Sequence, residues 1–351
     1  MDTKIIEICE ENIDRSKMEE MGKIIAGGGL VAFPTETVYG LGANALDETA
    51  VRRIFAAKGR PADNPLIVHV CALEDAVQVV REIPPAAAAL FRAFSPGPLT
   101  VIMPKAPELN DAVTAGLDTV AVRIPAHKTA RALIAAAGVP VAAPSGNLSG
   151  KPSPTEPAHI LADMDGRADG IILGGSCAVG VESTVVDVTG DIPVILRPGG
   201  VTQKMLEDVL GRVDIDRHVL EAAGTADKPK CPGMKYKHYA PDAEVTVVEG
   251  GMHAVREKIR VLLRERPAGK IGVLAYAGGV YDADLTLYAG ADNQAYARNL
   301  FGALRAFDQA GIETVFAEFC GDMGYGLAVR NRLYKSAAGR VIYVGDKEGK
   351  Q

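Results

Sequence analysis

Residues 29–42 read GLVAFPTETVYGLG, an apolar run that passes into a polar loop flanked by glycines. The run at 29–33 predicts a buried strand because it is short, apolar and bounded by turn-forming residues. Glu36 is the only charged residue of the loop, and the hydroxyls of Thr35 and Thr37 suit either a ligand or the capping of the next element. The stretch therefore predicts a strand with polar groups at its end.

The same pattern recurs through the first two-thirds of the chain. Further strands are predicted at 66–70, 99–103, 120–124, 139–143, 170–173, 184–188 and 194–196, and helices near 14–26, 48–58, 84–94, 128–137, 155–163 and 202–210. Helices and strands mixed in one segment favour helices packed on a sheet. The strand signals are irregularly spaced, so the pattern does not imply a strictly parallel sheet.

A second αβ segment follows a break in this pattern. Residues 213–243 are rich in Gly, Pro and polar side chains and predict a linker, although KYKHY at 235–239 is too aromatic and basic for a passive spacer. Beyond it, strands are predicted at 244–248, 270–276, 284–288 and 314–319, and helices at 252–265, 293–310 and 327–337. The predicted organisation is a first domain at 1–212, the linker at 213–243 and a small Rossmann-like domain at 244–351.

Composition argues against several classes of protein. The net charge of -6 disfavours a protein that binds nucleic acid mainly through phosphates, so an anionic substrate needs a local cluster of cations. The five cysteines contain no C-x-x-C pair, which favours reduced thiols over a zinc site or a disulfide framework. The N-terminus lacks signal-peptide features, and no apolar run approaches the roughly 20 residues that cross a bilayer. We therefore expect a cytoplasmic protein without a membrane segment.

Two cations stand at the end of the predicted helix at 48–58. The apolar stripe of this helix is continued by Lys58, so the stem of Lys58 starts from the buried face. Gly59 is expected to end the helix in the left-handed conformation, and Arg60 follows directly. The two cations either form an anion site near the core, or Lys58 reaches solvent and caps helix carbonyls. On this motif alone the two interpretations are equally good.

The stretch VAAPSGN at 141–147 passes from an apolar strand into a turn. Ser145 and Asn147 offer a hydroxyl and an amide to phosphate or to metal-bound water, and small residues let a ligand approach the backbone. A turn fixed by Asx and Ser hydrogen bonds is the alternative. Ser145 is not expected to be a covalent nucleophile, because the pattern is not G-x-S-x-G.

Further polar residues stand within or after predicted strands. Arg123 and Arg197 each follow a strand, where open α/β sheets bind ligands, although each taken alone fits a surface ion pair better. His69 taken alone is typical of a satisfied core histidine, and Ser183 of a turn. No P-loop or kinase motif is present, so any ATP is held by other means.

Several ordered motifs match one known family at once. The matching stretches are residues 29–41, 58–61, 64–66, 95–100, 122–125, 143–150, 183–187, 197–199 and, in the linker, 232–241. On these stretches the chain resembles the threonylcarbamoyl-AMP synthases of the YrdC-like superfamily, in their long two-domain form, over nearly its whole length. It departs from the family at Cys231, where the linker motif usually has Ser. The resemblance implies an α/β fold with a YrdC-like twisted mixed sheet and helices, followed by a smaller C-terminal Rossmann-like domain.

The resemblance also implies a reaction. L-threonine captures bicarbonate, and the resulting N-carboxylate attacks the α-phosphate of ATP to give threonylcarbamoyl-AMP and pyrophosphate, as in a nucleotidyltransferase. Mg²⁺ is expected to accompany ATP on its phosphates, and no metal site of the protein itself is expected. The adenylate then passes to a separate tRNA threonylcarbamoyl transferase, with weak contact to RNA as a further expectation.

Residue roles follow from the resemblance. Lys58 and Arg60 are the implied catalytic residues. The implied ATP contacts are Arg60, Asn64, Thr119, Ser145, Asn147, Ser153, Arg197, Tyr236 and His238, the last two from a linker that folds over the site. The implied threonine contacts are Thr37, His69, Arg123, Ala143 and Ser183, with Arg123 suited to the substrate carboxylate.

Two other functions remain in view. A carbamoyl-adenylate transferase of the hydrogenase-maturation type shares the YrdC-like domain, but it has zinc-binding cysteine pairs that this chain lacks. An RNA-binding module without catalysis is disfavoured by the negative net charge and by the lack of an aromatic stacking signature.

Overall fold

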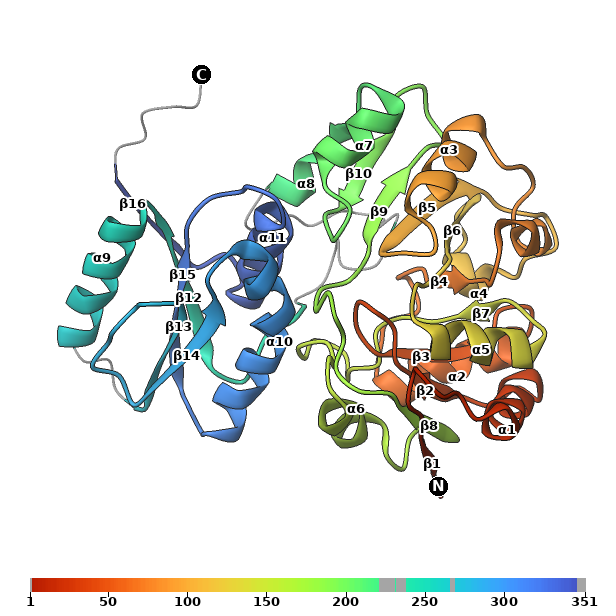
Figure 1. The fold of residues 1–351 in the computed structure, drawn as a ribbon, viewed down its shortest axis with the longest axis horizontal. Helices are drawn as coiled ribbons and strands as arrows, with labels where there is room; N and C mark the ends of the chain where they lie inside the picture. Colours follow the sequence, from red (N-terminus) through yellow and green to blue (C-terminus); the bar gives the residue numbers. More distant parts are fainter. Residues whose placement is uncertain (1, 221–230, 232–237, 266–268, 346–351) are drawn as a thin grey trace. The chain divides into compact units, whose positions relative to one another are not determined.

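The computed structural model describes residues 2–220, 231, 238–265 and 269–345 (Figure 1). The chain divides into two compact units, each of which is described by itself. The first unit includes residues 2–149, 153–220 and Cys231, and the second includes residues 150–152 and 238–345 without 266–268.

The first unit is built on one mixed sheet. Its strands are β1 (Lys4–Glu7), β2 (Val31–Phe33), β3 (Gly40–Asn44), β4 (Ile67–His69), β5 (Leu99–Pro104), β6 (Thr119–Arg123), β7 (Val141–Ala142), β8 (Gly170–Leu173), β9 (Thr184–Asp187), β10 (Val194–Arg197) and β11 (Asp214–Ile215). Their order in the sheet is β1-β8-β2-β3-β7-β4-β6-β5-β9-β10-β11. Parallel pairs such as β4–β6 alternate with antiparallel pairs such as β5–β6, so the predicted mixed sheet is confirmed.

Helices cover this sheet, and the predicted helix ranges agree with the structure to within two residues. They are α1 (Arg15–Ala26), α2 (Glu48–Lys58), a 3-10 turn (Leu73–Gln78), α3 (Pro85–Phe94), α4 (Asp111–Thr114), α5 (Lys128–Ala137), α6 (Pro157–Met164), α7 (Gln203–Leu210) and α8 (Arg217–Leu220). Asp47 begins α2 by accepting hydrogen bonds from the next turn, and Gly59 ends it with a φ of 61°, as predicted.

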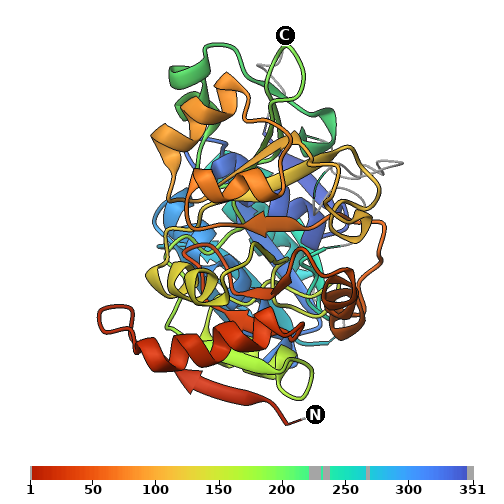
Figure 2. The same ribbon diagram turned by 90° about the vertical axis from the view of Figure 1, so that its right-hand side faces the viewer.

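Local chemistry explains two strands that the pattern does not predict. β1 runs beside β8 (Figure 2) and is mostly exposed, so its apolar signal is weak. β3 falls in the stretch predicted as a glycine-flanked loop, yet it pairs antiparallel with β2. A Cβ atom on Gly42 would lie 2.7 Å from Val141 Cγ1 and 2.8 Å from Phe33 Cε1. Glycine is therefore required there for strands to approach, not for a flexible loop.

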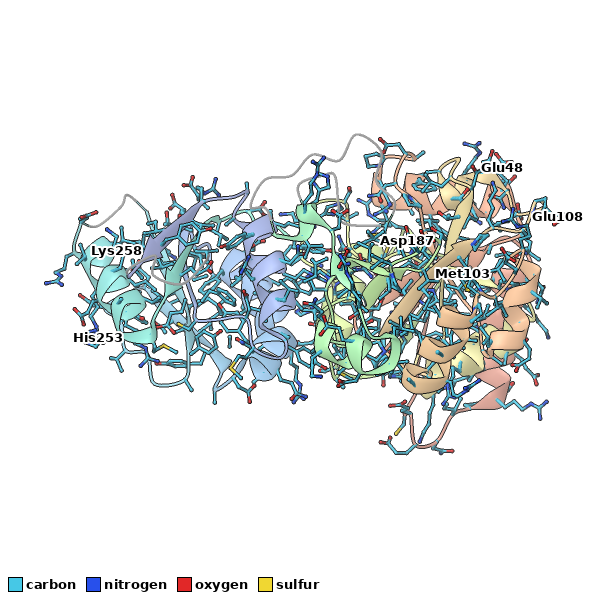
Figure 3. The ribbon with its side chains drawn as sticks, turned by 90° about the horizontal axis from the view of Figure 1, so that it is seen from above. Glu48, Met103, Glu108, Asp187, His253 and Lys258 are labelled. Atoms are coloured by element: carbon cyan, nitrogen blue, oxygen red, sulfur yellow. The ribbon has the colours of Figure 1, made fainter. Side chains whose placement is uncertain are left out.

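The sheet separates two apolar cores. Met21 and Ile25 of α1 pack with Leu133 of α5 and with Phe33 of β2. The larger core joins α2, α3, α6 and α7 through residues such as Ile54. Met103 and Asp187, on neighbouring strands β5 and β9, lie in the centre of this unit (Figure 3).

The second unit has a smaller sheet that is parallel throughout. Its elements are β12 (Glu244–Gly250), α9 (Met252–Arg264), β13 (Ile271–Tyr276), β14 (Leu285–Gly290), α10 (Asn293–Gln309), β15 (Thr314–Phe319), α11 (Gly326–Ser336) and β16 (Val341–Val344). The strand order β14-β13-β15-β12-β16 with parallel pairing confirms the Rossmann-like prediction. His253 marks the outer side of α9 (Figure 3).

The predicted domain boundaries stay a prediction, but the fold shows that part of the predicted linker belongs to the first sheet. β11 pairs with β10 and therefore belongs to the first sheet, although it lies in the stretch predicted as linker. Residues 221–230 and 232–237 of that stretch lie outside the described residues. Among the helices that the structure describes, none has both the length and the apolar character needed to cross a membrane.

Candidate active site

Polar residues form a row across the middle of the first sheet. His69 on β4 is the register partner of Arg123 on β6, and Arg123 is the register partner of Thr100 on β5. Register partners on adjacent strands point to the same face of a sheet, so these three side chains lie side by side. All three are buried.

The row continues onto β9 and β10. Arg197 at the end of β10 donates from Nε to the carbonyl oxygen of Ser183 and from Nη2 to its Oγ, both at 3.0 Å. The Ser183 hydroxyl is also 2.7 Å from the Thr100 hydroxyl. Arg197, an implied ATP contact, and Ser183, an implied threonine contact, thus lie in contact, and Thr100 joins them. Individually, Arg197 was expected to fit a surface ion pair, but it is only 5% exposed.

The turn after β7 meets the end of α2 at this row. Ala143 donates its N–H to the carbonyl oxygen of Ile67 on β4 at 2.9 Å. Lys58 Nζ donates to the carbonyl oxygens of Ser145, at 2.6 Å, and of Asn147. Lys58 is only 3% exposed, so of its two interpretations the structure favours a buried cation near the core.

The side chains of this turn also bond to each other. The Ser145 hydroxyl donates to Asn147 Oδ1 at 2.5 Å. The turn is thus held by a bond between the two side chains, as the alternative of a turn fixed by its own polar groups expects, and Asn147 also donates from Nδ2 to the carbonyl oxygen of Leu148 at 2.7 Å. Asn147 is 6% exposed, and Ser145 is partly buried.

Asn64 carries a buried amide without partners. Its side chain is 1% exposed, and neither Oδ1 nor Nδ2 makes a hydrogen bond to the part of the chain that the structure describes. Arg60 Nη2 donates to the backbone oxygens of Asn64 and Pro65 at 3.3 and 3.2 Å, which holds the two residues together. A buried amide that bonds to nothing in the protein is expected to serve a ligand or an ordered water.

His69 is neutral near neutral pH. Burial lowers its pKa to about 3, and the nearby charges of Arg123 and Arg197 act in the same direction. Its Nδ1 atom is buried and makes no hydrogen bond. A core histidine satisfied by the protein alone would not leave Nδ1 without a partner among the described residues, and a neutral imidazole beside two cations suits a ligand that offers a hydrogen bond.

The loop at 34–39 brings a carboxylate to the row. Arg123 Nη2 donates to Glu36 Oε1 at 2.7 Å, and both side chains are almost completely buried. Burial acts to raise the pKa of Glu36, but the charge and hydrogen bond of Arg123 outweigh it, so the pKa lies below its usual range. The neighbouring Thr35 and Thr37 hydroxyls are 2.8 Å apart, and Thr35 also bonds Val38, which fixes the loop.

The remaining predicted residues are less closely joined to the row. Thr119 is on β6 but at the opposite end from Arg123, about 13 Å along the strand. Ser153 is buried and donates to Glu182 Oε1 at 2.5 Å. His238 lies in the second unit, with its ring centroid 5.5 Å from that of Tyr239. Tyr236 lies outside the described residues.

Sequence reasoning did not single out three residues of this face. Thr100 and Glu182 bond directly to predicted site residues, and a polar residue in an apolar strand was the available signal for Thr100. Cys231, noted only as a departure in the linker motif, is 0% exposed and packs on an apolar patch that includes Ile67 and Ala121. These two residues precede His69 and Arg123 by two positions, so Cys231 lies on the same face of the sheet as the row.

The described residues contain no cluster of three His, Cys, Asp or Glu side chains that would hold a metal ion. The two buried carboxylates of the site are both engaged, Glu36 by Arg123 and Glu182 by Ser153. The site that the described residues form is thus rich in cations, hydroxyls and amides, which is the chemistry that holds anions.

Comparisons with known proteins show the family of the chain. A family model described as "Telomere recombination" matches residues 23–199, and one described as "Threonylcarbamoyl-AMP synthase, C-terminal domain" matches residues 201–338. Threonylcarbamoyl-AMP synthase of Pyrococcus abyssi is 49% identical over 97% of this chain and 99% of its own length, and that of Bacillus subtilis is 48% identical over 89% and 90%.

A solved structure is similar throughout. The crystal structure of P. abyssi Sua5 complexed with L-threonine has a TM-score of 0.94 and 49% identity, and the match covers 98% of this chain and 100% of that one. The chain belongs to the threonylcarbamoyl-AMP synthase family.

Proposed function

We propose that this chain is a nucleotidyltransferase that makes threonylcarbamoyl-AMP and pyrophosphate from L-threonine, bicarbonate and ATP. The observation that carries the proposal is the row of buried polar groups across β4, β6 and β5, with Arg123 and Arg197 on either side of Thr100 and Ser183. Such a row holds several anions close together, which is the main demand of this reaction. The L-threonine complex of a protein that is 49% identical supports the choice of amino acid.

Threonine binds at the His69 and Arg123 end of the row in this proposal. The guanidinium of Arg123 takes the substrate carboxylate, because planar forks match carboxylates with two parallel hydrogen bonds. His69, Ser183 and Thr37 offer hydrogen bonds to the hydroxyl and amine, while the small Ala143 leaves room for the substrate. The neutral state of His69 avoids a third positive charge there.

ATP binds where the cations of α2 meet the turn after β7. Lys58, Arg60 and Arg197 face the phosphates, and the free amide of Asn64 bonds to the nucleotide. The other ATP contacts proposed within the first unit are Ser145, Asn147, Ser153 and Thr119, while Tyr236 and His238 of the linker stay predicted contacts. Thr119 lies at the end of β6 opposite Arg123, and ATP in an extended conformation is long enough to reach it.

The chemistry requires no nucleophile from the protein. The threonine nitrogen forms a bond to the carbon of bicarbonate, a C–O bond of bicarbonate breaks, and the departing hydroxide takes a proton from the amine and leaves as water, which gives an N-carboxylate. An oxygen of this carboxylate attacks the α-phosphorus of ATP, the bond from that phosphorus to the β-phosphate bridging oxygen breaks, and pyrophosphate leaves with the electron pair. Lys58 and Arg60 stabilise the charge on the phosphates, and burial keeps water from the labile carbamate.

Mg²⁺ is proposed to arrive with ATP. It would supply positive charge on the phosphates, and the hydroxyl of Ser145 and the amide of Asn147 fit its water shell better than direct binding. The engagement of Glu36 and Glu182 by other residues supports few direct ligands from the protein.

The adenylate is proposed to pass to a separate tRNA threonylcarbamoyl transferase in the cytoplasm, where ATP and tRNA meet. Weak contact with RNA fits this handover, but the net charge of -6 argues that it is not the basis of the activity.

The test is pyrophosphate release from ATP by the full-length chain, with threonine and bicarbonate each omitted in turn. We expect release only when both are present, and we expect the same dependence for the threonylcarbamoyl-AMP product followed by mass spectrometry. Release without threonine, or salt-sensitive RNA binding without any release, would contradict the proposal.

A further inference from the structure

We propose that Glu36 is a positioning residue for substrate: its carboxylate holds the guanidinium of Arg123 in the orientation that receives the carboxylate of threonine. The inference rests on the proposed function. It extends the site to a residue that touches Arg123 and not the substrate.

The geometry leaves one donor of Arg123 open. Nη2 is bonded to Glu36 at 2.7 Å, while Nε is buried and makes no hydrogen bond within the described residues. A guanidinium has five N–H donors in a rigid plane, so fixing one nitrogen restricts the direction of the others. The Nε–H then points in one direction and is available to an oxygen of an anion such as a carboxylate.

The sequence brings Glu36 to Arg123 from a distant element. Glu36 follows β2, and three strands lie between β2 and β6 in the sheet, so the loop has to cross them. Its backbone is anchored on the far side: Val179 donates its N–H to the carbonyl oxygen of Glu36 at 2.7 Å, and Gly180 to that of Thr37 at 3.1 Å. The carboxylate is thus placed by backbone bonds that do not depend on Arg123.

The energetics favour position over stability as the role of this pair. Both side chains leave water, 5% and 11% of their surface remaining exposed, and that desolvation offsets much of the attraction between the charges. Glu36 Oε2 is buried and accepts no hydrogen bond within the described residues. An ion pair that served only stability would be stronger if Oε2 also accepted a hydrogen bond. An ion pair that orients Arg123 needs only the contact with Nη2.

A cavity limits the choice of variant. Glu36, His127 and Gly174 line a cavity of about 410 Å³ beside the ion pair. Truncation of Glu36 to Ala would let water enter from this cavity and hydrate Arg123. The effect of lost orientation of Arg123 would then not be separable from the effect of its hydration. Glu36→Gln keeps the volume and removes the charge, and Glu36→Asp keeps the charge on a shorter stem.

The experiment measures threonine KM, kcat and calorimetric Kd for the full-length wild type, Glu36→Gln and Glu36→Asp. Selectivity for L-threonine over L-threoninamide, which lacks the carboxylate, is measured for each. The matched control is Asp169→Asn, which breaks another Arg–carboxylate pair of the same unit, with Arg53 at 2.8 Å, away from the row.

For Glu36→Gln we expect threonine KM and Kd to rise on the order of tenfold, kcat at saturating threonine to change little, and selectivity over threoninamide to fall. Glu36→Asp is expected to recover part of the loss, and Asp169→Asn to keep wild-type selectivity. A merely structural role would lower stability and leave selectivity unchanged.

Unchanged threonine KM and selectivity in Glu36→Gln would overturn the inference while the proposed function stands. Absence of threonine-dependent pyrophosphate release in the wild type would instead defeat the proposed function. If Glu36→Gln does not fold, Glu36→Asp decides: selectivity equal to that of the wild type contradicts the positioning role, and a partial loss supports it.

Discussion

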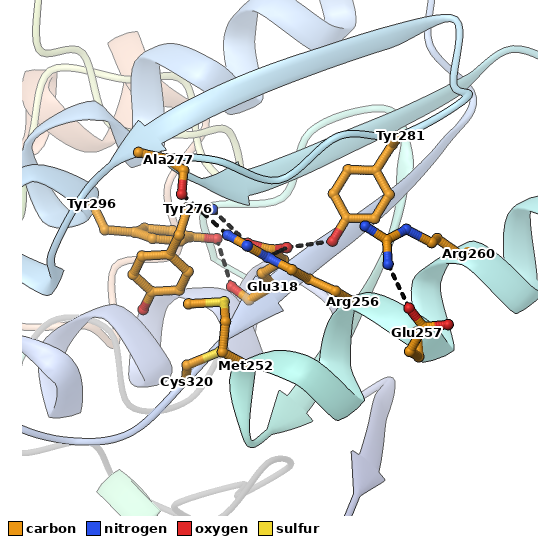
Figure 4. Close-up of polar contacts among 10 residues, drawn as sticks. All are labelled: Met252, Arg256, Glu257, Arg260, Tyr276, Ala277, Tyr281, Tyr296, Glu318 and Cys320. Atoms are coloured by element: carbon orange, nitrogen blue, oxygen red, sulfur yellow. Dashed lines mark hydrogen bonds and ion pairs between the residues drawn. The ribbon is translucent and has the colours of Figure 1, made fainter.

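Each unit of the molecule buries one glutamate that is paired with an arginine, and the two pairs differ in how completely they are satisfied. In the second unit, Glu318 is 0% exposed and lies at the centre of a closed network (Figure 4). One oxygen accepts from Arg256 Nε at 3.2 Å and from the Tyr281 hydroxyl, and the other accepts from the Tyr276 backbone N–H at 2.6 Å. In the first unit, only one oxygen of Glu36 accepts a hydrogen bond.

The difference separates a structural network from a binding site. Around Glu318 the donors and acceptors are used within the protein, so nothing is left to hold a ligand. In the first unit the Arg123 Nε, the His69 Nδ1 and the Asn64 amide are buried and make no hydrogen bond within the described residues. Buried polar groups that lack a protein partner are costly, so their presence in one site is best explained by a substrate that completes them.

The largest expected effect is on the stability of the second unit. Glu318→Gln removes the negative charge that pairs with Arg256. It also puts an amide N–H beside groups that are themselves hydrogen-bond donors. We therefore expect a loss of about 3 kcal/mol in the free energy of unfolding of that unit. Hydrogen exchange of the β13 and β15 amides measures it. Threonine-dependent pyrophosphate release per folded molecule should remain within twofold of wild type, about 0.4 kcal/mol, and a larger loss would mean that this network is not purely structural.

The next effect is on substrate binding. Arg123→Ala removes the proposed carboxylate contact, and we expect kcat/KM for threonine to fall about 100-fold, which corresponds to about 3 kcal/mol. Steady-state kinetics with saturating ATP measures it, and the KM for ATP should change little. Equal losses for threonine and ATP would show that Arg123 does not belong to the threonine end of the row.

A further effect, whose size depends on the pH, concerns the stability of the first unit. Because the folded-state pKa of His69 is lowered to about 3, the unfolded chain binds a proton below the ordinary histidine pKa while the folded chain does not. The contribution of neutral His69 to the free energy of unfolding is fully present above about pH 6.5. It is lost as the pH falls towards 3, by at most about 1.4 kcal/mol for each pH unit. Urea unfolding of the wild type and His69→Asn between pH 7 and 4 measures it. Equal slopes for the two proteins would contradict the neutral, buried state of His69.

The smallest effect is on the hydroxyl pair. Thr100→Val keeps the shape of the side chain and removes the bond to Ser183, so we expect threonine KM to rise about fivefold, or about 1 kcal/mol. Thr129→Val is the control, because the Thr129 hydroxyl is buried and bonds to nothing. A rise in KM that is equal for both variants would show a general packing effect.

The sequence predicted most of the regular elements for clear physical reasons. The apolar stripe and the Asp47 and Gly59 caps define α2, and its predicted range of 48–58 agrees with the structure. β3 escaped prediction because its glycines read as a loop, although they serve the close approach of Phe33 and Val141. β11 escaped because two residues of strand carry too little periodicity to stand out from a linker.

The candidate site was predictable as a set of motifs but not as a network. Arg123 and Glu36 are 87 positions apart, and only the crossing of the loop over the sheet brings them together. Thr100 stands out only as a polar residue in an apolar strand, and its connection to the site follows only from its register with Arg123. The roles of the individual site residues remain predictions, since motif matches name residues without placing a ligand.

Arg123 Nε, the donor that Glu36 leaves open, is expected to receive the threonine carboxylate, and a crystal structure of this chain with L-threonine measures this contact. We expect a carboxylate oxygen about 2.8 Å from Arg123 Nε, with Glu36 still bonded to Nη2. A threonine whose carboxylate is bound by other groups, with Arg123 Nε left unoccupied, would contradict it.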